Sequence, residues 1–211
     1  TQNQALSALL FLCRHVIHLE LEDMDKNVRA KRGRKLPVVL SVDEVRAILE
    51  HVDPEHLLAV KLIYGGGLRL MDLCRLRVKD IDFDSGLLII REGKGGNDRA
   101  TPLADSAKED LREHLAKVKA LHEQHLAAGV GEVELPGALS RKYPNAAREW
   151  GWQYVFPAAN LSTDPRGGKI RRHHIDPSTI QKALRKAVKA AGIIKPASVH
   201  SLRHSFATHL L

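Results

Sequence analysis

The 211-residue sequence predicts a mainly α-helical domain with one small antiparallel β-sheet, an α+β fold. Most of the chain spaces its apolar residues three or four positions apart, as amphipathic helices do. One segment, residues 87–103, instead has two short strand-like runs around a glycine-rich turn. Hydrophobic residues form 44% of the chain, which is enough to build an ordinary buried core.

The first 36 residues predict one helix followed by a charged linker. Residues 5–19 space their apolar side chains so that they share one face of a helix. Residues 20–36 are rich in charge and precede Pro37, a pattern typical of a connection between domains. Within this stretch, residues 29–35 carry five cations and no acidic residue.

Three helices are expected next. Ser41-Val-Asp-Glu44 is a capping box, in which the serine and glutamate side chains bond the free N–H groups of a helix start. A second helix should span residues 54–64, with a proline in its first turn. The glycines at 65–67 should end it, because glycine tolerates tight backbone turns. A third helix should span residues 69–76.

A β-hairpin and a long helix follow. Residues 87–91 and 99–103 should pair as strands across the turn at residues 92–98. The long amphipathic helix should turn these side chains inward: Leu111, Leu115, Val118, Leu121, His122 and Leu126. Residues 129–172 are rich in glycine, proline and aromatic residues and have no clear helix or strand pattern.

Two helices should close the chain. The first should begin at Asp176-Pro177, end at Gly192 and bury four side chains, Ile180, Leu184, Ala187 and Val188. Ser198 should cap the last helix, whose inward side chains are expected to be Val199, Leu202, Phe206 and Leu210.

The charge of the chain indicates a polyanionic partner. The formal net charge is +8, the pI is about 9.6, and residues 169–211 carry nine Lys or Arg against one acid. This charge favours nucleic acid ahead of a membrane surface as the partner, and a basic protein without such a partner is the alternative. No apolar run of about 18 residues is present, so no membrane span is expected. The two cysteines have neither disulfide nor metal spacing, which fits a reducing cytoplasm, and no cofactor or metal ion is expected.

Three sets of residues are candidates for chemistry on a phosphate. Arg69 follows the glycine turn at a helix start, where a guanidinium can present two N–H groups to an anion. Lys94 sits on the hairpin turn, from which a lysine can donate a proton to a leaving oxygen. His200 and Arg203 share one face near a helix N-terminus, suited to an anionic transition state. Taken one at a time, each also fits an ordinary surface residue.

The ordered set of these residues resembles the tyrosine recombinase (phage integrase) family. The matching pieces are Gly67-Leu-Arg69-Leu-Met-Asp72-Leu, Gly93-Lys94-Gly-Gly-Asn-Asp-Arg-Ala-Thr-Pro102 and His200-Ser-Leu-Arg203-His-Ser-Phe-Ala-Thr-His209. The resemblance implies that Arg69, His200 and Arg203 bind the scissile phosphate. It also implies that Lys94 protonates the 5′-hydroxyl leaving group and that Asp72 orients its neighbours.

The resemblance further predicts the domain organisation. Residues 1–21 correspond to the last helix of the family's SAM-like core-binding domain, and residues 22–36 to a basic interdomain linker that crosses DNA. Residues 37–211 correspond to the catalytic domain, truncated at its C-terminal end. The linker cations expected to contact DNA are Lys31, Arg32, Arg34 and Lys35.

An extra segment at about residues 136–174 looks like the insertion of integron integrases. In that subfamily the insertion recognises flipped-out bases on a folded single-stranded recombination site. Aromatic rings flanked by cations can hold such a base by stacking. The alternative is that the aromatic residues form a small satellite core. The expected DNA contacts are Tyr143, Trp150, Trp152, Arg171, Arg172, His173 and His174.

The family resemblance places the nucleophilic tyrosine, and a His or Trp before it, beyond Leu211. Tyr64, Tyr143 and Tyr154 match no nucleophile position, so the 211-residue chain by itself is expected not to cleave DNA. In its complete form, the expected protein is a bacterial, cytoplasmic, nucleoid-associated recombinase that forms 3′-phosphotyrosine links. It is expected to integrate and excise integron gene cassettes as a tetramer on DNA.

Other functions are weighed against this one. The alternatives are a DNA-binding remnant without catalysis and a phage-type or Xer-type recombinase. A metal hydrolase is disfavoured because the histidines lack HExxH or Cys/His finger spacing. A cysteine nucleophile is disfavoured because Cys74 lies among leucines and is expected to be buried.

Overall fold

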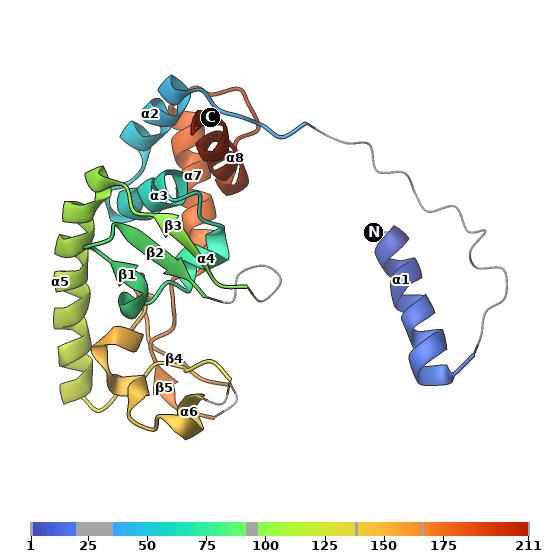
Figure 1. Ribbon diagram of the computed structural model, residues 1–211, viewed down its shortest axis with the longest axis vertical. Helices are drawn as coiled ribbons and strands as arrows, with labels where there is room; N and C mark the ends of the chain where they lie inside the picture. Colours follow the sequence, from blue (N-terminus) through green and yellow to red (C-terminus); the bar gives the residue numbers. More distant parts are fainter. Residues whose placement is uncertain (1, 20–35, 92–96, 138, 166, 211) are drawn as a thin grey trace. The chain divides into compact units, whose positions relative to one another are not determined.

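The chain forms two compact units, residues 1–36 and residues 37–211 (Figure 1). The computed structural model describes residues 2–19, 36–91, 97–137, 139–165 and 167–210. In the first unit, helix α1 (Gln2–Leu12) begins earlier than expected and continues into a π-helical turn, Cys13–Ile17. None of the residues of α1 is buried, and the side chains of Leu9, Phe11 and Leu12 are exposed. The second unit is mostly helical with a small antiparallel sheet, as the sequence predicts.

Three short helices begin the second unit: α2 (Val42–His51), α3 (Pro54–Gly65) and α4 (Leu70–Cys74). The predicted capping box at the start of α2 is present. Ser41 N–H donates to Glu44 Oε2 at 2.7 Å, and Glu44 N–H donates to Ser41 Oγ at 3.1 Å. The two apolar faces of α2 and α3 then pack into the main core.

Helix α4 is shorter than the expected span of 69–76. The chain leaves the helix after Cys74 because its next residues pair with a distant segment. Val155 N–H donates to Leu76 O at 2.9 Å, and Val78 N–H donates to Gln153 O at 3.1 Å. These tertiary hydrogen bonds pair the Leu76 carbonyl and the Val78 N–H with residues 153–155 instead of leaving them to a further helical turn.

The main sheet has three antiparallel strands in the order β1-β2-β3: Ile81–Asp82, Leu87–Ile90 and Arg99–Pro102. The predicted hairpin is β2 and β3, with Leu88 opposite Thr101. Leu88 and Ile90 are buried, whereas Leu87 and Ile89, which alternate with them, are half-buried. The short strand β1 was not predicted, because two residues cannot show an alternating pattern.

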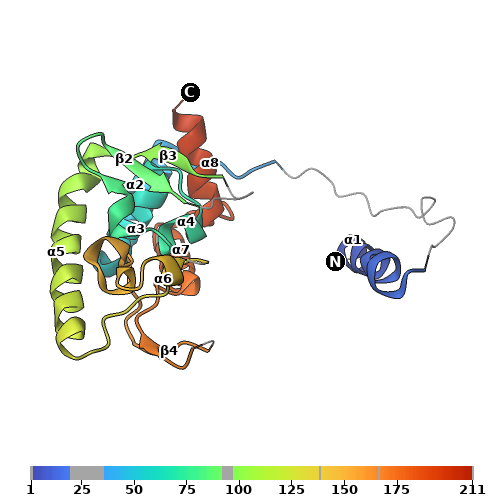
Figure 2. The same ribbon diagram turned by 60° about the horizontal axis from the view of Figure 1, so that its bottom comes forward.

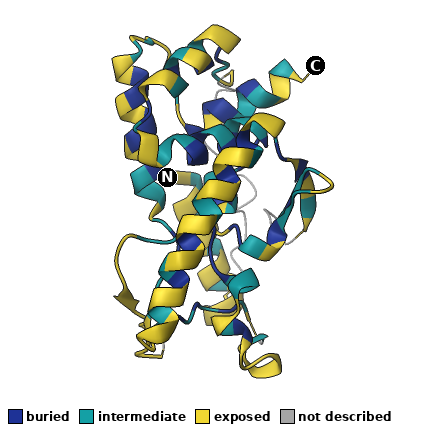
Figure 3. Ribbon diagram, turned by 90° about the vertical axis from the view of Figure 1, so that its left-hand side faces the viewer, coloured by how far each residue is buried: buried dark blue, intermediate teal, exposed yellow. Residues whose placement is uncertain are grey.

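Helix α5 (Asp105–Ala127) covers one side of this unit (Figure 1). Its inner face buries Leu111, Val118 and His122, whereas its outer face is exposed along most of its length (Figure 3). Leu126 was expected to face inward, but its side chain is 39% exposed. The prediction fails there because the last turn of α5 extends beyond the main core.

Helices α7 (Pro177–Ala190) and α8 (Val199–His209) complete the core by packing on α2 and α3. Asp176 caps α7 and Ser198 caps α8, as predicted. Leu210 was expected to face inward but follows the end of α8 and is 68% exposed. Ser205 is fully buried within α8, and its Oγ accepts a hydrogen bond from Leu40 N–H at 2.8 Å.

The segment between α5 and α7 has little regular structure. It contains helix α6 (Leu139–Lys142), two single turns of 3-10 helix, and the strand pair β4 (Ser162–Thr163) and β5 (Ile170–Arg171). This strand pair lies at the opposite end of the unit from α2 (Figures 1 and 2). Within the described ranges, no helix is both long and apolar enough to span a membrane.

Candidate active site

A glycine turn joins α3 to α4 and sets the position of Arg69. Gly67 has a φ of +55°, in the left-handed region that glycine adopts at little cost. A Cβ atom at Gly67 would lie 2.4 Å from Cδ1 of Phe206, so the phenyl ring of α8 fills the space that a side chain would need. Thr101 Oγ1 donates to the carbonyl of Gly66. The turn therefore brings α4, α8 and the sheet together.

Arg69 and Asp72 lie at the first turn of α4. Arg69 is the N-cap residue, and its N–H donates to Asp72 Oδ2 at 3.1 Å. The Arg69 guanidinium stays 3.9 Å from the same carboxylate oxygen. The Arg69 side chain is 36% exposed and that of Asp72 only 9%. The arginine can therefore reach a ligand while the carboxylate is held inside the protein.

Arg203 reaches this turn from α8. Its Nη1 donates to the carbonyl of Gly67, two residues before Arg69. Burial lowers the pKa of Arg203, and the positive charges of Arg69 and Arg99 lower it further. The negative charge of Asp72 opposes these effects. An arginine stays protonated at neutral pH, so positive charge from two distant segments is concentrated beside one turn.

His200 stands one helical turn before Arg203. It is exposed, and its ring lies nearly perpendicular to that of His204, with centroids 4.3 Å apart. It lines a groove of about 330 Å³ together with Leu70, the residue after Arg69. The structure therefore brings Arg69, Asp72 and Arg203 together at the glycine turn, whereas His200 lines the neighbouring groove, which those three residues do not line.

Arg99 is a further residue of this site, and sequence reasoning missed it. Its Nη2 donates to Asp72 Oδ2 at 2.6 Å, which connects the start of β3 to α4. The residue stands in the motif that contains Lys94. The motif gave a signal that could have marked it, but the sequence does not show which side chain the arginine contacts.

Several predicted residues lie outside the described part of the chain: Lys94 and the linker cations Lys31, Arg32, Arg34 and Lys35. The flanks of the hairpin turn that carries Lys94 are described. Arg91 Nη1 donates to Asp98 Oδ2 at 2.7 Å across the base of that turn. The role of Lys94 stays a prediction.

Neither Cys74 nor Tyr64 has the features of an activated nucleophile. Burial raises the pKa of the Cys74 thiol to about 11, with a smaller contribution from Asp176, so the thiol is protonated at neutral pH. Burial also raises the pKa of Tyr64. The Tyr64 hydroxyl lies 2.8 Å from Nδ1 of His209, which ties α3 to the end of α8.

Comparison with known proteins identifies the family. Residues 38–211 match the family model described as "Phage integrase family". The chain belongs to the phage integrase family. An "Integrase/recombinase" of Escherichia coli is 48% identical over all 211 residues, which span 63% of that relative. The chain therefore covers less than two thirds of the length of this related integrase.

The fold of this integrase-family chain is that of tyrosine recombinase catalytic domains. The crystal structure of XerA recombinase matches with a TM-score of 0.54 and 25% identity, over 99% of this chain and 61% of that one. A lambda integrase tetramer bound to a Holliday junction matches with a TM-score of 0.58, over 96% of this chain and 49% of that one. At its 21% identity, the second match shows the fold alone.

In this integrase-family chain, a pocket of about 670 Å³ separates the main core from the extra segment. Asp72 and Arg91 line its core side, and Trp152, His173 and His174 line its other side. The rings of His173 and His174 are 4.0 Å apart at their centroids. Three of the seven predicted base-contacting residues therefore line one pocket next to the candidate active site.

The other predicted contacts lie elsewhere in the segment. Tyr143 is 47% exposed. The Trp150 ring packs beside His122 of α5, with centroids 6.0 Å apart. Arg171 forms an ion pair with Asp164 at 2.7 Å. These residues do not line the pocket of about 670 Å³.

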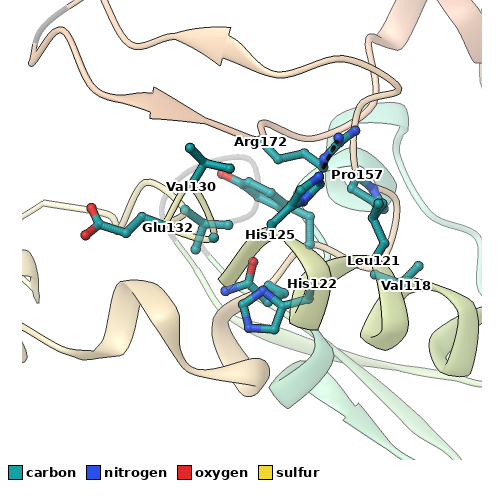
Figure 4. Close-up of a pocket in the computed structure, with 12 residues that line it drawn as sticks. Val118, Leu121, His122, His125, Val130, Glu132, Pro157 and Arg172 are labelled. Carbon is teal, nitrogen blue, oxygen red and sulfur yellow. Dashed lines mark hydrogen bonds between the residues drawn. The ribbon is translucent and has the colours of Figure 1, made fainter. Parts of the chain in front are cut away.

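Arg172 connects the extra segment to the end of α5 (Figure 4). Its Nη2 donates to Nε2 of His125 at 3.1 Å, and its Nη1 donates to the carbonyl of Ala159 at 2.7 Å. These contacts give Arg172 a structural role, and the satellite-core alternative describes this end of the segment better than base binding does.

Acid is expected to destabilise the contact between α5 and the extra segment. Burial lowers the pKa of His114, His122 and His125 below the ordinary value of 6.5. Lys117 adds to the effect at His114, and Arg172 adds to it at His125. Because the folded pKa lies below the unfolded one, the stabilisation is complete above pH 6.5 and is lost as the pH falls through the folded pKa.

Thermal unfolding at about pH 7.5 and about pH 5.5 measures this effect, and Tm should fall by several degrees at the lower pH. The variant His125→Gln keeps an acceptor for Arg172 but cannot titrate, so its Tm should depend less on pH. An unchanged Tm across this range would show that the three histidines do not couple protonation to folding.

Proposed function

We propose that the protein containing this chain is a site-specific tyrosine recombinase that cleaves and rejoins DNA. The observation that carries the proposal is the meeting of Arg69, Asp72 and Arg203 around the Gly67 turn. Two guanidiniums at one turn can bind a phosphodiester and absorb the charge that develops on its non-bridging oxygens. The basic net charge of +8 and membership of the phage integrase family support the same function.

The proposed reaction is a transesterification. A tyrosine hydroxyl attacks phosphorus and releases its proton to solvent, a 3′-phosphotyrosine bond forms, and the bond from phosphorus to the 5′ oxygen breaks. Arg69, His200 and Arg203 stabilise the phosphorane-like transition state. Lys94 gives a proton to the departing 5′ oxygen, and the reverse reaction with another 5′-hydroxyl rejoins the strand. Such a protein acts on DNA in the bacterial cytoplasm, at the nucleoid, and works as a tetramer.

The finer proposal is that the recombination site is a folded single strand, as in integron cassette exchange. The pocket lined by Trp152, His173 and His174 supports it, because a volume of about 670 Å³ accommodates a flipped-out nucleobase. Lys79 Nζ lies 4.4 Å from the centroid of the Trp152 ring, and its charge is paired with the buried Asp80 carboxylate at 3.1 Å. A phage-type or Xer-type recombinase is the second candidate.

Binding to designed DNA separates these two candidates. The 211-residue chain is titrated with a hairpin that has two extrahelical bases, with the same hairpin lacking them, and with a plain duplex. Integron-type recognition predicts tighter binding to the first by about 5- to 100-fold, the usual range for base stacking on aromatic rings. Trp152→Ala should remove this preference and keep duplex affinity.

Trp150→Ala is the matched control, because Trp150 packs on His122 and does not line the pocket. Equal affinity for hairpin and duplex would favour the phage or Xer type.

Cleavage is tested in the natural gene product, read to its stop codon, by the appearance of a denaturant-stable covalent adduct with DNA. The absence of an adduct would favour a non-catalytic DNA-binding protein, and an adduct with the 211-residue chain alone would refute a nucleophile beyond Leu211.

A further inference from the structure

One carboxylate oxygen, Oδ2 of Asp72, is shared by two arginines. Arg99 Nη2 donates to it at 2.6 Å, whereas the nearest guanidinium nitrogen of Arg69 stays at 3.9 Å. The Asp72 side chain is only 9% exposed, so water can solvate its charge very little. A buried carboxylate needs a cation close by, and at this site the close cation is Arg99.

The other contacts of Arg99 point to the same role. Its Nη1 is buried without a hydrogen-bond partner in the part of the chain that the structure describes. Its other terminal nitrogen, Nη2, forms the ion pair with Asp72. Arg69, in contrast, gives its backbone N–H to Asp72 and keeps its guanidinium beyond hydrogen-bond distance.

We infer that Arg99 is a positioning residue that holds the charge of Asp72 and so leaves the Arg69 guanidinium free to bind phosphate. The inference rests on the proposed phosphate-binding role of Arg69 and Arg203. Without Arg99, the nearest cation to the buried carboxylate would be the Arg69 guanidinium. Arg69 would then close the 3.9 Å gap to Asp72, and the carboxylate would compete with phosphate for the same N–H donors.

This mechanism predicts a specific pattern among three variants. Arg99→Met should weaken phosphate binding, because Asp72 then captures Arg69. Adding Asp72→Asn should restore binding, because an amide has no charge to compete but still accepts from Arg69 N–H. Arg99→Lys should keep most of the affinity, because a lysine still neutralises Asp72.

The test is a titration of the 211-residue chain with inorganic phosphate, followed by the ¹⁵N–¹H signals of the arginine side chains. Arg99→Met should raise the apparent Kd by about tenfold, the lower end of the range for residues that support a binding group. The double variant and Arg99→Lys should stay within about threefold of the parent. Arg112→Met is the control, because Arg112 pairs with Glu109 on α5 and takes no part in the site.

Two results would overturn the inference. An unchanged Kd for Arg99→Met would show that Asp72 does not capture Arg69. A double variant as weak as Arg99→Met would show that Arg99 binds phosphate itself. If Arg99→Met does not fold, Arg99→Gln takes its place, because it also removes the cation while Asp72 keeps its charge. Because no DNA is used, the proposed function can fail in the adduct assay while this pattern still holds.

Discussion

Replacing Arg203 by alanine is expected to lower the rate of DNA cleavage by about 10²- to 10³-fold, the usual loss when one donor to a developing oxyanion is removed. Arg203 Nη1 already bonds the Gly67 carbonyl, so its guanidinium is held in place before the phosphate arrives. Affinity for DNA should fall much less, because many phosphate contacts share the binding energy. Single-turnover cleavage by the natural gene product, alongside DNA-binding anisotropy, separates the two quantities.

Two further variants complete the Arg203 experiment. Arg203→Lys keeps the charge but loses the planar pair of donors, so it should recover only part of the rate. Arg46→Ala removes an exposed arginine of α2 that pairs with Asp43, and it should cleave normally. Cleavage by Arg203→Ala at a near-parental rate would remove Arg203 from the site.

Replacing Gly67 by alanine is expected to destabilise the second unit by about 2–5 kcal/mol. Part of this cost is the left-handed backbone, with φ at +55°. The larger part is the clash of the new methyl group with the Phe206 ring, 2.4 Å away. Chemical denaturation of the 211-residue chain measures the loss.

Gly129 provides the matched control for this prediction. Its φ is +76°, but a Cβ atom there would meet nothing within 4 Å, so Gly129→Ala adds backbone strain without a clash. Its expected cost is about 1–2 kcal/mol. In the double variant Gly67→Ala/Phe206→Ala the new methyl group has no ring to meet. If the clash causes the loss of stability, Gly67→Ala should therefore cost less free energy of unfolding in a Phe206→Ala background. Equal effects of the two glycine variants would mean that the Phe206 ring moves aside freely.

Local signals in the sequence predicted most of the fold. The capping serines Ser41 and Ser198 and the proline at the start of α7 mark helix starts through bonds within one turn. The hairpin was predictable because its two strand-like runs lie next to each other in the sequence, on either side of one glycine-rich turn. Helix α4 ends early because of a partner about 80 residues away, Val155, and no local pattern carries that information.

The candidate site was predictable as a set of residues but not as a set of contacts. The motifs supply Arg69, Asp72 and Arg203, whose helices the structure brings together at Gly67. The ion pair between Arg99 and Asp72 joins residues 27 positions apart and depends on how the sheet packs on α4. The insertion shows the same limit, because composition cannot tell that Trp152 lines a pocket whereas Trp150 packs on α5.

The hydrogen bond from Leu40 to Ser205 has a consequence for synthesis on the ribosome. It joins residues 165 positions apart, at the two ends of the second unit, and α2 packs on α7 much as α3 packs on α8. While the chain emerges, α2 lacks its contacts with α7 and α3 lacks its contacts with α8, although α3 can already pack on α4 and α5, until α7 and α8 leave the exit tunnel. Such late closure makes for slow folding and a nascent chain that chaperones would need to shield.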